Sequence, residues 1–160
     1  MKNLEFEMRL AKYNDITAIS EIMTESFKIY AQTSGAGDVD ALHETDADIK
    51  KDIDNPNKYV FVAFSNGVAV GSVRVAVDMP HKSAYLSRFG VKPNTQNKGI
   101  GKSMLSFVDT KMQELGIKQI SLHTSATLSD LVCFYYDKGF YVDSTSKERG
   151  YIRALMCKDL

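Results

Sequence analysis

The sequence predicts a mixed α/β domain, in which a central sheet of about seven strands carries about four helices on its faces. Three observations predict this fold class. Some short segments alternate apolar and polar residues, others repeat apolar residues at helical spacing, and turns containing glycine or asparagine separate them. In chain order these segments give β-α-α-β-β-β-α-β-α-β-β over 1–160, which we expect to form a single domain.

The first third of the chain predicts one strand and two helices. Residues 4–10 alternate in polarity, which is typical of a strand with one buried face. Apolar residues then recur at helical spacing from about 14 to 30, behind a candidate N-cap at Asn14 or Asp15. The segment 40–55 is strongly charged and has few apolar positions, which predicts a short surface helix.

Three consecutive strands follow, and we expect them to be antiparallel. The two β-rich runs of 58–78 flank Asn66-Gly67, a dipeptide that is strongly favoured in hairpin turns. Gly71, within the second run, indicates either a bulge or the close approach of another segment. The third strand is predicted at 82–91.

The last part of the chain alternates helices and strands. The predicted elements are a helix at 101–115, a buried strand at 118–124, a helix at 127–139, and two final strands at 140–146 and 151–160. Gly116 and Gly139 are the expected ends of the two helices. Thr127 or Ser129 is the expected N-cap of the second one.

The composition argues against several classes of protein. The 160 residues include 20 basic and 20 acidic side chains, and this zero net charge argues against a nucleic-acid binder. The only cysteines are Cys133 and Cys157, and they form no C-x-x-C motif, whereas a structural zinc site needs four ligands; we expect no metal site, and no disulfide framework in a chain of this size. The sequence shows no signal-peptide core and no apolar run of membrane length. We therefore expect a cytoplasmic protein, monomeric or homodimeric, that has no membrane partner.

The segment 91–105 contains two overlapping glycine patterns, both of which suggest a loop that binds phosphate. Residues 101–103, Gly-Lys-Ser, match the end of a nucleotide-binding P-loop, but that motif needs a glycine where Gln96 stands. The dinucleotide motif G-x-G-x-x-G also fails, because Met104 occupies the position of its third glycine. Neither nucleotide-binding motif is therefore present.

Gly99 and Gly101 nevertheless stand between a strand and a helix, where an anion is the favoured ligand. Because they have no side chains, a bulky phosphate can approach the backbone closely. The free N–H groups and the dipole at the start of the following helix would attract its charge. The alternative is a glycine-rich turn that holds no ligand.

Three motifs in combination make this pattern specific. They are Val91-x-Pro93, Gln96-x-x-Gly99-x-Gly101 and, farther along the chain, Phe134-Tyr135-x-x-x-Gly139-Phe140. This combination resembles the GNAT superfamily of N-acetyltransferases, which use acetyl-coenzyme A, and the predicted element order is similar to that fold over essentially the whole chain. The resemblance implies that an acetyl group passes from acetyl-coenzyme A to a primary amine by direct attack in a ternary complex.

The resemblance also implies where the coenzyme binds. The loop whose backbone N–H groups would hold its pyrophosphate consists of Gln96, Asn97, Lys98, Gly99, Ile100, Gly101 and Lys102. The pantetheine arm would pair with a strand edge at Phe89, Gly90 and Val91, where Gly90 suits the bulge that splays this strand from the next. Leu128 stands where the family often has an asparagine, so Ser129 is the candidate substitute for that contact.

Two residues are candidates for acid–base chemistry. Tyr135 matches the family's tyrosine near the coenzyme sulfur, which implies a general acid that protonates the leaving thiolate. Tyr135, unlike Tyr136, stands four residues before Gly139 as the motif requires; packing is its alternative role. Residues 85–91, where the family often places its general base, contain no Asp or Glu. His123 is therefore the candidate base, acting through a water relay, and a merely hydrogen-bonded histidine is the alternative.

The acceptor is either a small-molecule amine or a peptide amine. The acidic side chains of the segment 40–55 form either a solvated face or a rim that favours a cationic acceptor. Two other functions stay open, namely a non-catalytic acyl-coenzyme A binding or regulatory domain, and an acetyltransferase for protein or peptide amines.

Overall fold

The computed structural model describes residues 5–95 and 99–160, and their elements follow the predicted order. The strands are β1 Phe6–Leu10, β2 Lys58–Ser65, β3 Val68–Asp78, β4 Ser83–Val91, β5 Gln119–Ser125, β6 Tyr141–Ser146 and β7 Arg153–Asp159. The α-helices are α1 Ile16–Thr33, α2 Asp46–Asp54, α3 Ile100–Glu114 and α4 Ser129–Asp137. Short 3-10 turns occur at η1 Tyr13–Asp15, η2 Asp40–His43 and η3 Pro93–Thr95. The predicted fold class is confirmed.

All seven strands form one sheet in the order β1-β2-β3-β4-β5-β7-β6. Neighbouring strands are antiparallel except for β4 and β5, which are parallel. The expected antiparallel arrangement of β2, β3 and β4 is therefore confirmed. In the described part of the chain, no helix is both long and apolar enough to cross a membrane.

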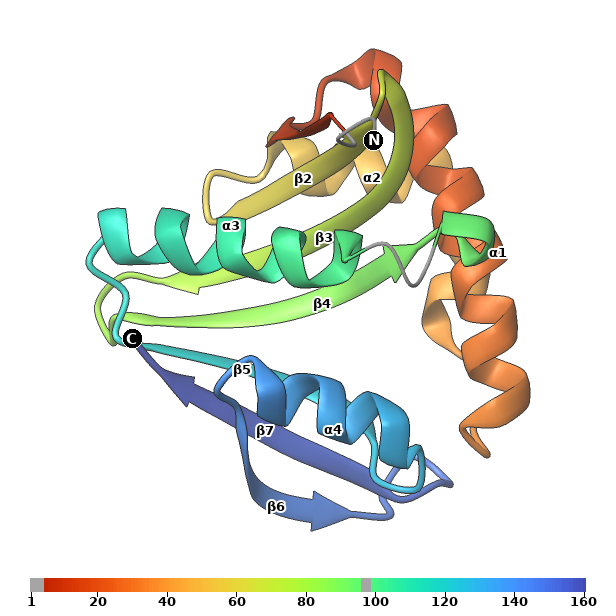
Figure 1. Ribbon diagram of the computed structural model, residues 1–160, viewed down its shortest axis with the longest axis vertical. Helices are drawn as coiled ribbons and strands as arrows, with labels where there is room; N and C mark the ends of the chain where they lie inside the picture. The colour runs from red at the N-terminus through yellow and green to blue at the C-terminus, as the bar shows by residue number, and fades with distance from the viewer. Residues whose placement is uncertain (1–4, 96–98) are drawn as a thin grey trace.

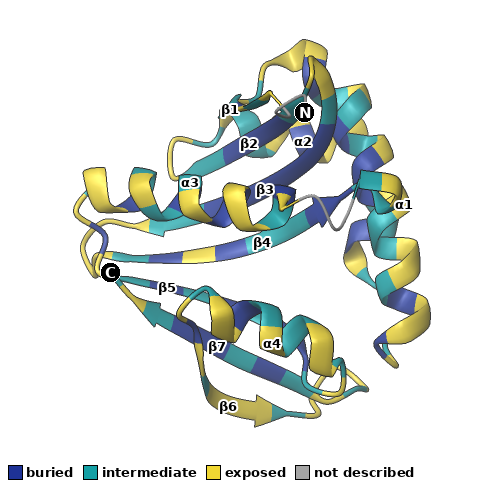
Figure 2. Cartoon of the chain, in the orientation of Figure 1, coloured by how far each residue is buried: buried dark blue, intermediate teal, exposed yellow. Residues whose placement is uncertain are grey.

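Helices cover both faces of the sheet (Figure 1). Alternate side chains of a strand enter the hydrophobic core on one face or the other. On β2, Phe61 and Ala63 belong to the larger core with α3 and α4, whereas Val60 and Val62 belong to the smaller core with α1 and α2. Period-two alternation places successive side chains on opposite faces, which is why one strand serves both cores. Figure 2 shows the resulting buried stretches along the central strands.

The strands β4 and β5 stay together over a short distance only. Across these two fully described strands, pairing is limited to Ser83 with Gln119, Ala84 with Ile120, and Tyr85 with Ser121. Beyond Tyr85, β4 continues toward α1 while β5 continues beside β7, as Figure 1 shows. This divergence positions the cavities described below.

A bulge in β4 lies close to the predicted position, but not at Gly90. Ser72 of β3 pairs with Gly90, and Arg74 pairs with Ser87, so the two residues 88–89 oppose one residue of β3. Arg88, within the bulge, has a left-handed φ of 51°. The expectation that Gly90 forms the bulge is wrong.

Gly90 instead permits close packing between β4 and α1. A Cβ atom at this position would lie 3.0 Å from Cε of Met23 and still closer to Oγ of Ser26. Glycine therefore lets α1 approach the strand at the point where the sheet opens.

Three other local expectations need correction or refinement. Asp15 precedes α1 without capping it through its side chain; its carboxylate accepts hydrogen bonds from Arg9 and from the backbone N–H of Lys12, each at 2.7 Å. Leu128 occupies the N-cap position of α4, so neither predicted polar cap is used. Gly71 lies beside a bulge, because Gly71 pairs with Ala63 and Ala69 with Phe64, and it also permits a close approach, since a Cβ there would lie 2.6 Å from Sδ of Met104.

Candidate active site

Two neighbouring cavities lie where β4 and β5 diverge. We call the first the helix-side cavity, of about 500 Å³, because α1, α3 and α4 form most of its wall with the end of β4. The second, the sheet-side cavity of about 510 Å³, lies over β4, β5 and the β6–β7 hairpin. The residues that line both are Ser26, Tyr30, Phe89 and Leu131. The two cavities therefore adjoin across these four side chains.

The start of α3 forms one end of the helix-side cavity. Gly99, Ile100, Gly101 and Lys102 all line it. Gly99 is the N-cap, with a left-handed φ of 74° that favours glycine. The first backbone N–H groups of an α-helix lack partners within the helix, and the helix dipole places partial positive charge beside them. This end of the cavity is therefore suited to a phosphate group.

Gly101 also lies against two aromatic rings of the cavity. A Cβ atom on Gly101 would be 3.3 Å from the ring of Phe134 and 3.4 Å from the ring of Phe89. Those two rings are stacked, with their centroids 6.1 Å apart. Any larger residue at 101 would therefore press on rings that line the cavity.

Most predicted coenzyme-binding residues gather around this cavity. Phe89, Gly90 and Val91 at the end of β4 line it, as do the four residues at the start of α3. Gln96, Asn97 and Lys98 lie outside the described residues. Ser129 begins α4, but the described lining includes its neighbours Leu128 and Asp130 rather than Ser129 itself.

Tyr135 lines the sheet-side cavity from α4 and is almost completely buried. Its side chain is enclosed by Phe89, Phe134 and Phe140, with ring centroids 5.3–6.4 Å away. Burial raises the pKa of the Tyr135 phenol, so the hydroxyl stays protonated at neutral pH. Among the described residues this hydroxyl has no hydrogen-bond partner. Tyr136, by contrast, is 51% exposed.

His123 and Tyr85 form a pair on the floor of the sheet-side cavity. Nδ1 of His123 and the Tyr85 hydroxyl share a hydrogen bond of 2.6 Å. Burial, followed by the charges of Arg153 and Arg149, lowers the pKa of His123. The imidazole is therefore neutral at neutral pH and able to accept a proton.

Tyr30 stands where the two cavities join. Its hydroxyl lies 3.2 Å from that of Tyr151, which comes from the β6–β7 hairpin. Burial, and then this hydrogen bond, raise the pKa of Tyr30. Sequence analysis did not select Tyr30, Ser26 or Tyr85, because their positions follow from strand register and helix packing rather than from any motif.

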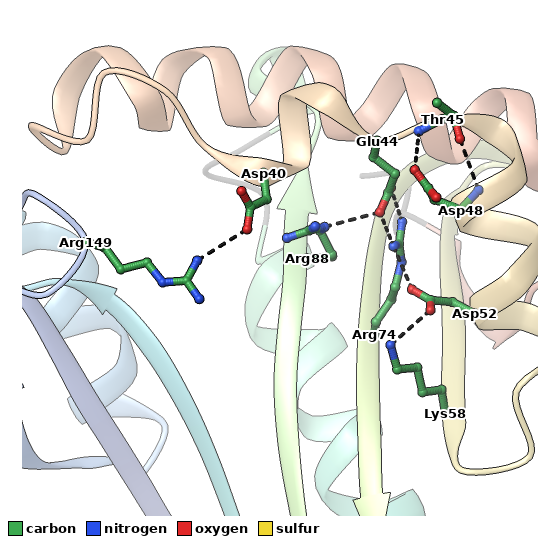
Figure 3. Close-up of polar contacts among 9 residues, drawn as sticks. All are labelled: Asp40, Glu44, Thr45, Asp48, Asp52, Lys58, Arg74, Arg88 and Arg149. Carbon is green, nitrogen blue, oxygen red and sulfur yellow. Dashed lines mark hydrogen bonds and ion pairs between the residues drawn. The ribbon is translucent and has the colours of Figure 1, made fainter.

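In the acidic segment 40–55, the two carboxylates with little exposure, Glu44 and Asp52, point toward basic side chains rather than toward an acceptor (Figure 3). Arg74, on β3, donates two hydrogen bonds to Glu44 and one of 2.9 Å to Asp52. The side chains of Arg74 and Glu44 are only 4% and 5% exposed. Arg88 adds a bond of 3.3 Å to Glu44, and Lys58 one of 3.0 Å to Asp52. The predicted cation-attracting rim therefore lacks these two carboxylates.

The other acidic residues of this segment fit the solvated-face interpretation. Asp46, Asp48 and Asp54 are exposed. Asp48 closes a capping box with Thr45, and Asp54 accepts a hydrogen bond from Tyr13. Within 5–95 and 99–160, no three His, Cys, Asp or Glu side chains gather as a metal site would require.

Comparison with known proteins gives one family match and several similar structures. The model of the acetyltransferase (GNAT) family matches residues 17–140. The structure of PaiA N-acetyltransferase from Thermoplasma acidophilum in complex with coenzyme A is 23% identical, with a TM-score of 0.83, covering 98% of this chain and 99% of that chain. No curated protein sequence matches this chain.

Two further structures show similar folds. Spermidine N-acetyltransferase from Vibrio cholerae, in complex with coenzyme A and spermine, is 18% identical with a TM-score of 0.78, covering 96% of this chain and 95% of that chain. The ribosomal-protein-S18-alanine N-acetyltransferase from Escherichia coli is 14% identical with a TM-score of 0.78, covering 97% and 94% of the respective chains. At these identities the likeness shows the fold, and the acceptors of those two proteins differ from each other.

Proposed function

This chain belongs to the GNAT family of acetyltransferases, and from that premise we propose that it transfers an acetyl group from acetyl-coenzyme A to a primary amine by direct attack in a ternary complex. The observation that carries the proposal is the junction of the two cavities. One cavity has a helix N-terminus suited to phosphate, and the other contains Tyr135 and the His123–Tyr85 pair. Both substrates can therefore meet between β4 and β5.

The helix-side cavity fits the coenzyme in two respects. We assign the pyrophosphate of the coenzyme to the N–H groups at the start of α3, where Gly99 and Gly101 leave the backbone accessible. Its pantetheine arm is assigned to the edge of β4 at Phe89 and Gly90, a part of the strand that no longer pairs with β5 in the described chain. A backbone N–H at this edge would polarise the thioester carbonyl.

The acceptor amine is assigned to the sheet-side cavity, where two groups handle its protons. The nitrogen attacks the thioester carbonyl carbon, so that a C–N bond forms and the C–S bond breaks. In this step the Tyr85 hydroxyl is the donor in its hydrogen bond with Nδ1 of His123. The substrate ammonium gives a proton to the Tyr85 oxygen while Tyr85 passes its own proton to Nδ1. Tyr135 protonates the leaving thiolate and later regains a proton from solvent.

Two features favour catalysis over a non-catalytic coenzyme-binding domain. The Tyr135 ring is buried, and its hydroxyl is bonded to no described residue while Tyr135 lines the sheet-side cavity, so the hydroxyl is free to donate a hydrogen bond to a reacting group. The His123–Tyr85 pair faces the same cavity and supplies a neutral base. A pure binding domain needs neither group.

The test is release of free thiol from acetyl-coenzyme A in the presence of a panel of small amines and peptides. We expect thiol release that depends on an amine and yields a stoichiometric amount of the acetylated product. If coenzyme A binds but no amine or peptide releases thiol, the regulatory-domain alternative holds. If only peptides react, the enzyme is a protein or peptide acetyltransferase.

A further inference from the structure

The charged side chains that line the sheet-side cavity are sorted by depth. Asp38, Asp40, Glu148 and Arg149 are exposed and stand at its rim. Among the described residues of the lining, Arg88 and Arg153 are the charged side chains that are half-buried. The interior of the cavity is therefore positive, although its rim carries both signs.

Two of the rim carboxylates already have side-chain hydrogen-bond partners. Asp40 accepts a hydrogen bond of 3.3 Å from Arg149 across the mouth of the cavity (Figure 3). Asp38 lies 2.7 Å from the imidazole of His43. The side chains of Asp38 and Asp40 are 71% and 76% exposed, so water screens them from a ligand on the cavity floor.

Arg153 lacks such a partner. It begins β7 opposite Ser125, and within the described chain it forms no ion pair with a carboxylate. Its Nε atom is buried and has no hydrogen-bond partner among the described residues. Nε of Arg74 is also without a described partner inside its ion-pair cluster, so what distinguishes Arg153 is that it lines the cavity and has no described carboxylate partner, which leaves it able to bind an anion there.

Arg88 is only partly neutralised. Its bond to Glu44 uses Nε, and Glu44 also accepts two hydrogen bonds from Arg74. The connected cluster holds three cations, Arg74, Arg88 and Lys58, against two carboxylates, Glu44 and Asp52, which leaves one positive charge in excess. Arg88 is the cation of this cluster that lines the cavity.

The ionisable groups on the cavity floor respond to this positive charge. Burial raises the pKa of Tyr85, while Arg153, Arg149 and Arg88 each oppose that shift. A substrate ammonium at the same place would be destabilised, which favours the neutral, nucleophilic amine. A second, anionic group on the substrate would offset the repulsion.

We propose that the acceptor is an amine that also carries a carboxylate or a phosphate, and that Arg153 and Arg88 bind this anionic group inside the sheet-side cavity. The inference rests on the proposed acetyl transfer and specifies its substrate class. Guanidinium groups bind carboxylate and phosphate through paired hydrogen bonds, so either anion suits the site. Polyamines, which carry only cations, are the class that this cavity disfavours.

The test uses acceptors that differ only in the anionic group. The pairs are lysine with cadaverine and O-phosphoethanolamine with ethanolamine, with spermidine as the polyamine. We expect kcat/KM for the better anionic acceptor to exceed that of its partner by roughly 10- to 100-fold, the range of a charge-assisted hydrogen bond. The two pairs distinguish carboxylate from phosphate.

Variants of Arg153 test whether this residue causes the preference for anionic acceptors. Arg153→Met should reduce the ratio of kcat/KM between the anionic acceptor and its partner toward 1, mainly through a higher KM for the anionic acceptor. Arg153→Lys should keep part of this ratio. Lys51→Met removes an exposed charge of α2 outside the cavity and should leave the ratio unchanged. Circular dichroism and thermal unfolding verify that each variant is folded.

The outcomes separate this inference from the proposed function. If spermidine and the plain amines react as well as or better than the anionic acceptors, acetyl transfer stands and the substrate class is overturned. If the preference exists but survives in Arg153→Met, the assignment to Arg153 is overturned. If no amine reacts at all, the proposed function itself fails.

Discussion

Replacing Tyr135 with phenylalanine should separate the roles of this residue in catalysis and in stability. The substitution removes one oxygen atom and keeps a ring that contacts Phe89, Phe134 and Phe140. Because the hydroxyl has no described hydrogen-bond partner, its loss should leave the free energy of unfolding unchanged or raise it by up to about 1 kcal/mol. The transition state, in contrast, loses its proton donor.

The expected loss of activity is much larger than the change in stability. Removal of a general acid typically costs about 10²- to 10⁴-fold in rate, which corresponds to about 3–5 kcal/mol in activation free energy. The assays are thiol release at saturating substrates, urea unfolding, and calorimetric titration with coenzyme A. Coenzyme A affinity should change little, because Tyr135 lines the sheet-side cavity and not the helix-side one.

Tyr136→Phe is the matched control, since it makes the same change one residue away on an exposed ring. It should leave both rate and stability unaltered. If Tyr135→Phe keeps kcat within threefold of the parent, Tyr135 is a packing residue and the assignment is refuted. A loss of more than about 1 kcal/mol in unfolding free energy would show that the hydroxyl has a structural partner.

Three further predictions concern the base and the coenzyme site. Because burial and two arginines lower the pKa of His123 below its ordinary value of about 6.5, kcat should rise with pH through that lowered pKa and be level by neutral pH. His123→Gln should abolish this inflexion, and an unchanged pH–rate profile in that variant would refute the assignment. Gly90→Ala should destabilise the fold by about 1–3 kcal/mol in urea unfolding, because its Cβ overlaps Ser26 and Met23; unaltered stability would contradict this packing. Gly101→Asp should weaken coenzyme A binding by about 100-fold or more in calorimetric titration, through like-charge repulsion at the proposed pyrophosphate site. Gly101→Ala adds the Cβ without the charge, and equal losses in both variants would show that crowding alone is responsible.

The sequence predicted the features that depend on local spacing. Period-two and helical patterns located the strands and helices, because burial of one face imposes those periods on the residues themselves. The choice of Tyr135 over Tyr136 also followed from spacing, and Tyr135 is the one of the two that lines the sheet-side cavity. Gly99 was identifiable because a left-handed cap favours glycine, and Gly101 because a residue without a side chain leaves the backbone accessible.

The features that escaped prediction depend on contacts between distant segments. Tyr85 meets His123 only because β4 and β5 are parallel in a particular register. Glu44 is neutralised by Arg74, which is 30 residues away and on the far side of a hairpin, so its charge alone suggested a rim. Gly90 suggested a bulge from its flexibility, whereas helix packing explains its position.

The short contact between β4 and β5 also has a consequence for cooperativity. Among the described strands only three residue pairs form the ladder between β4 and β5, fewer than at any other strand pair, so this seam is the weakest line of backbone pairing in the sheet. A coenzyme arm lying along β4 would bridge the seam and bind the native state alone. At a concentration 100 times its Kd, such a ligand adds about 2.7 kcal/mol to the unfolding free energy. The lifetime of the folded protein would then increase with the concentration of the coenzyme that it uses as a substrate.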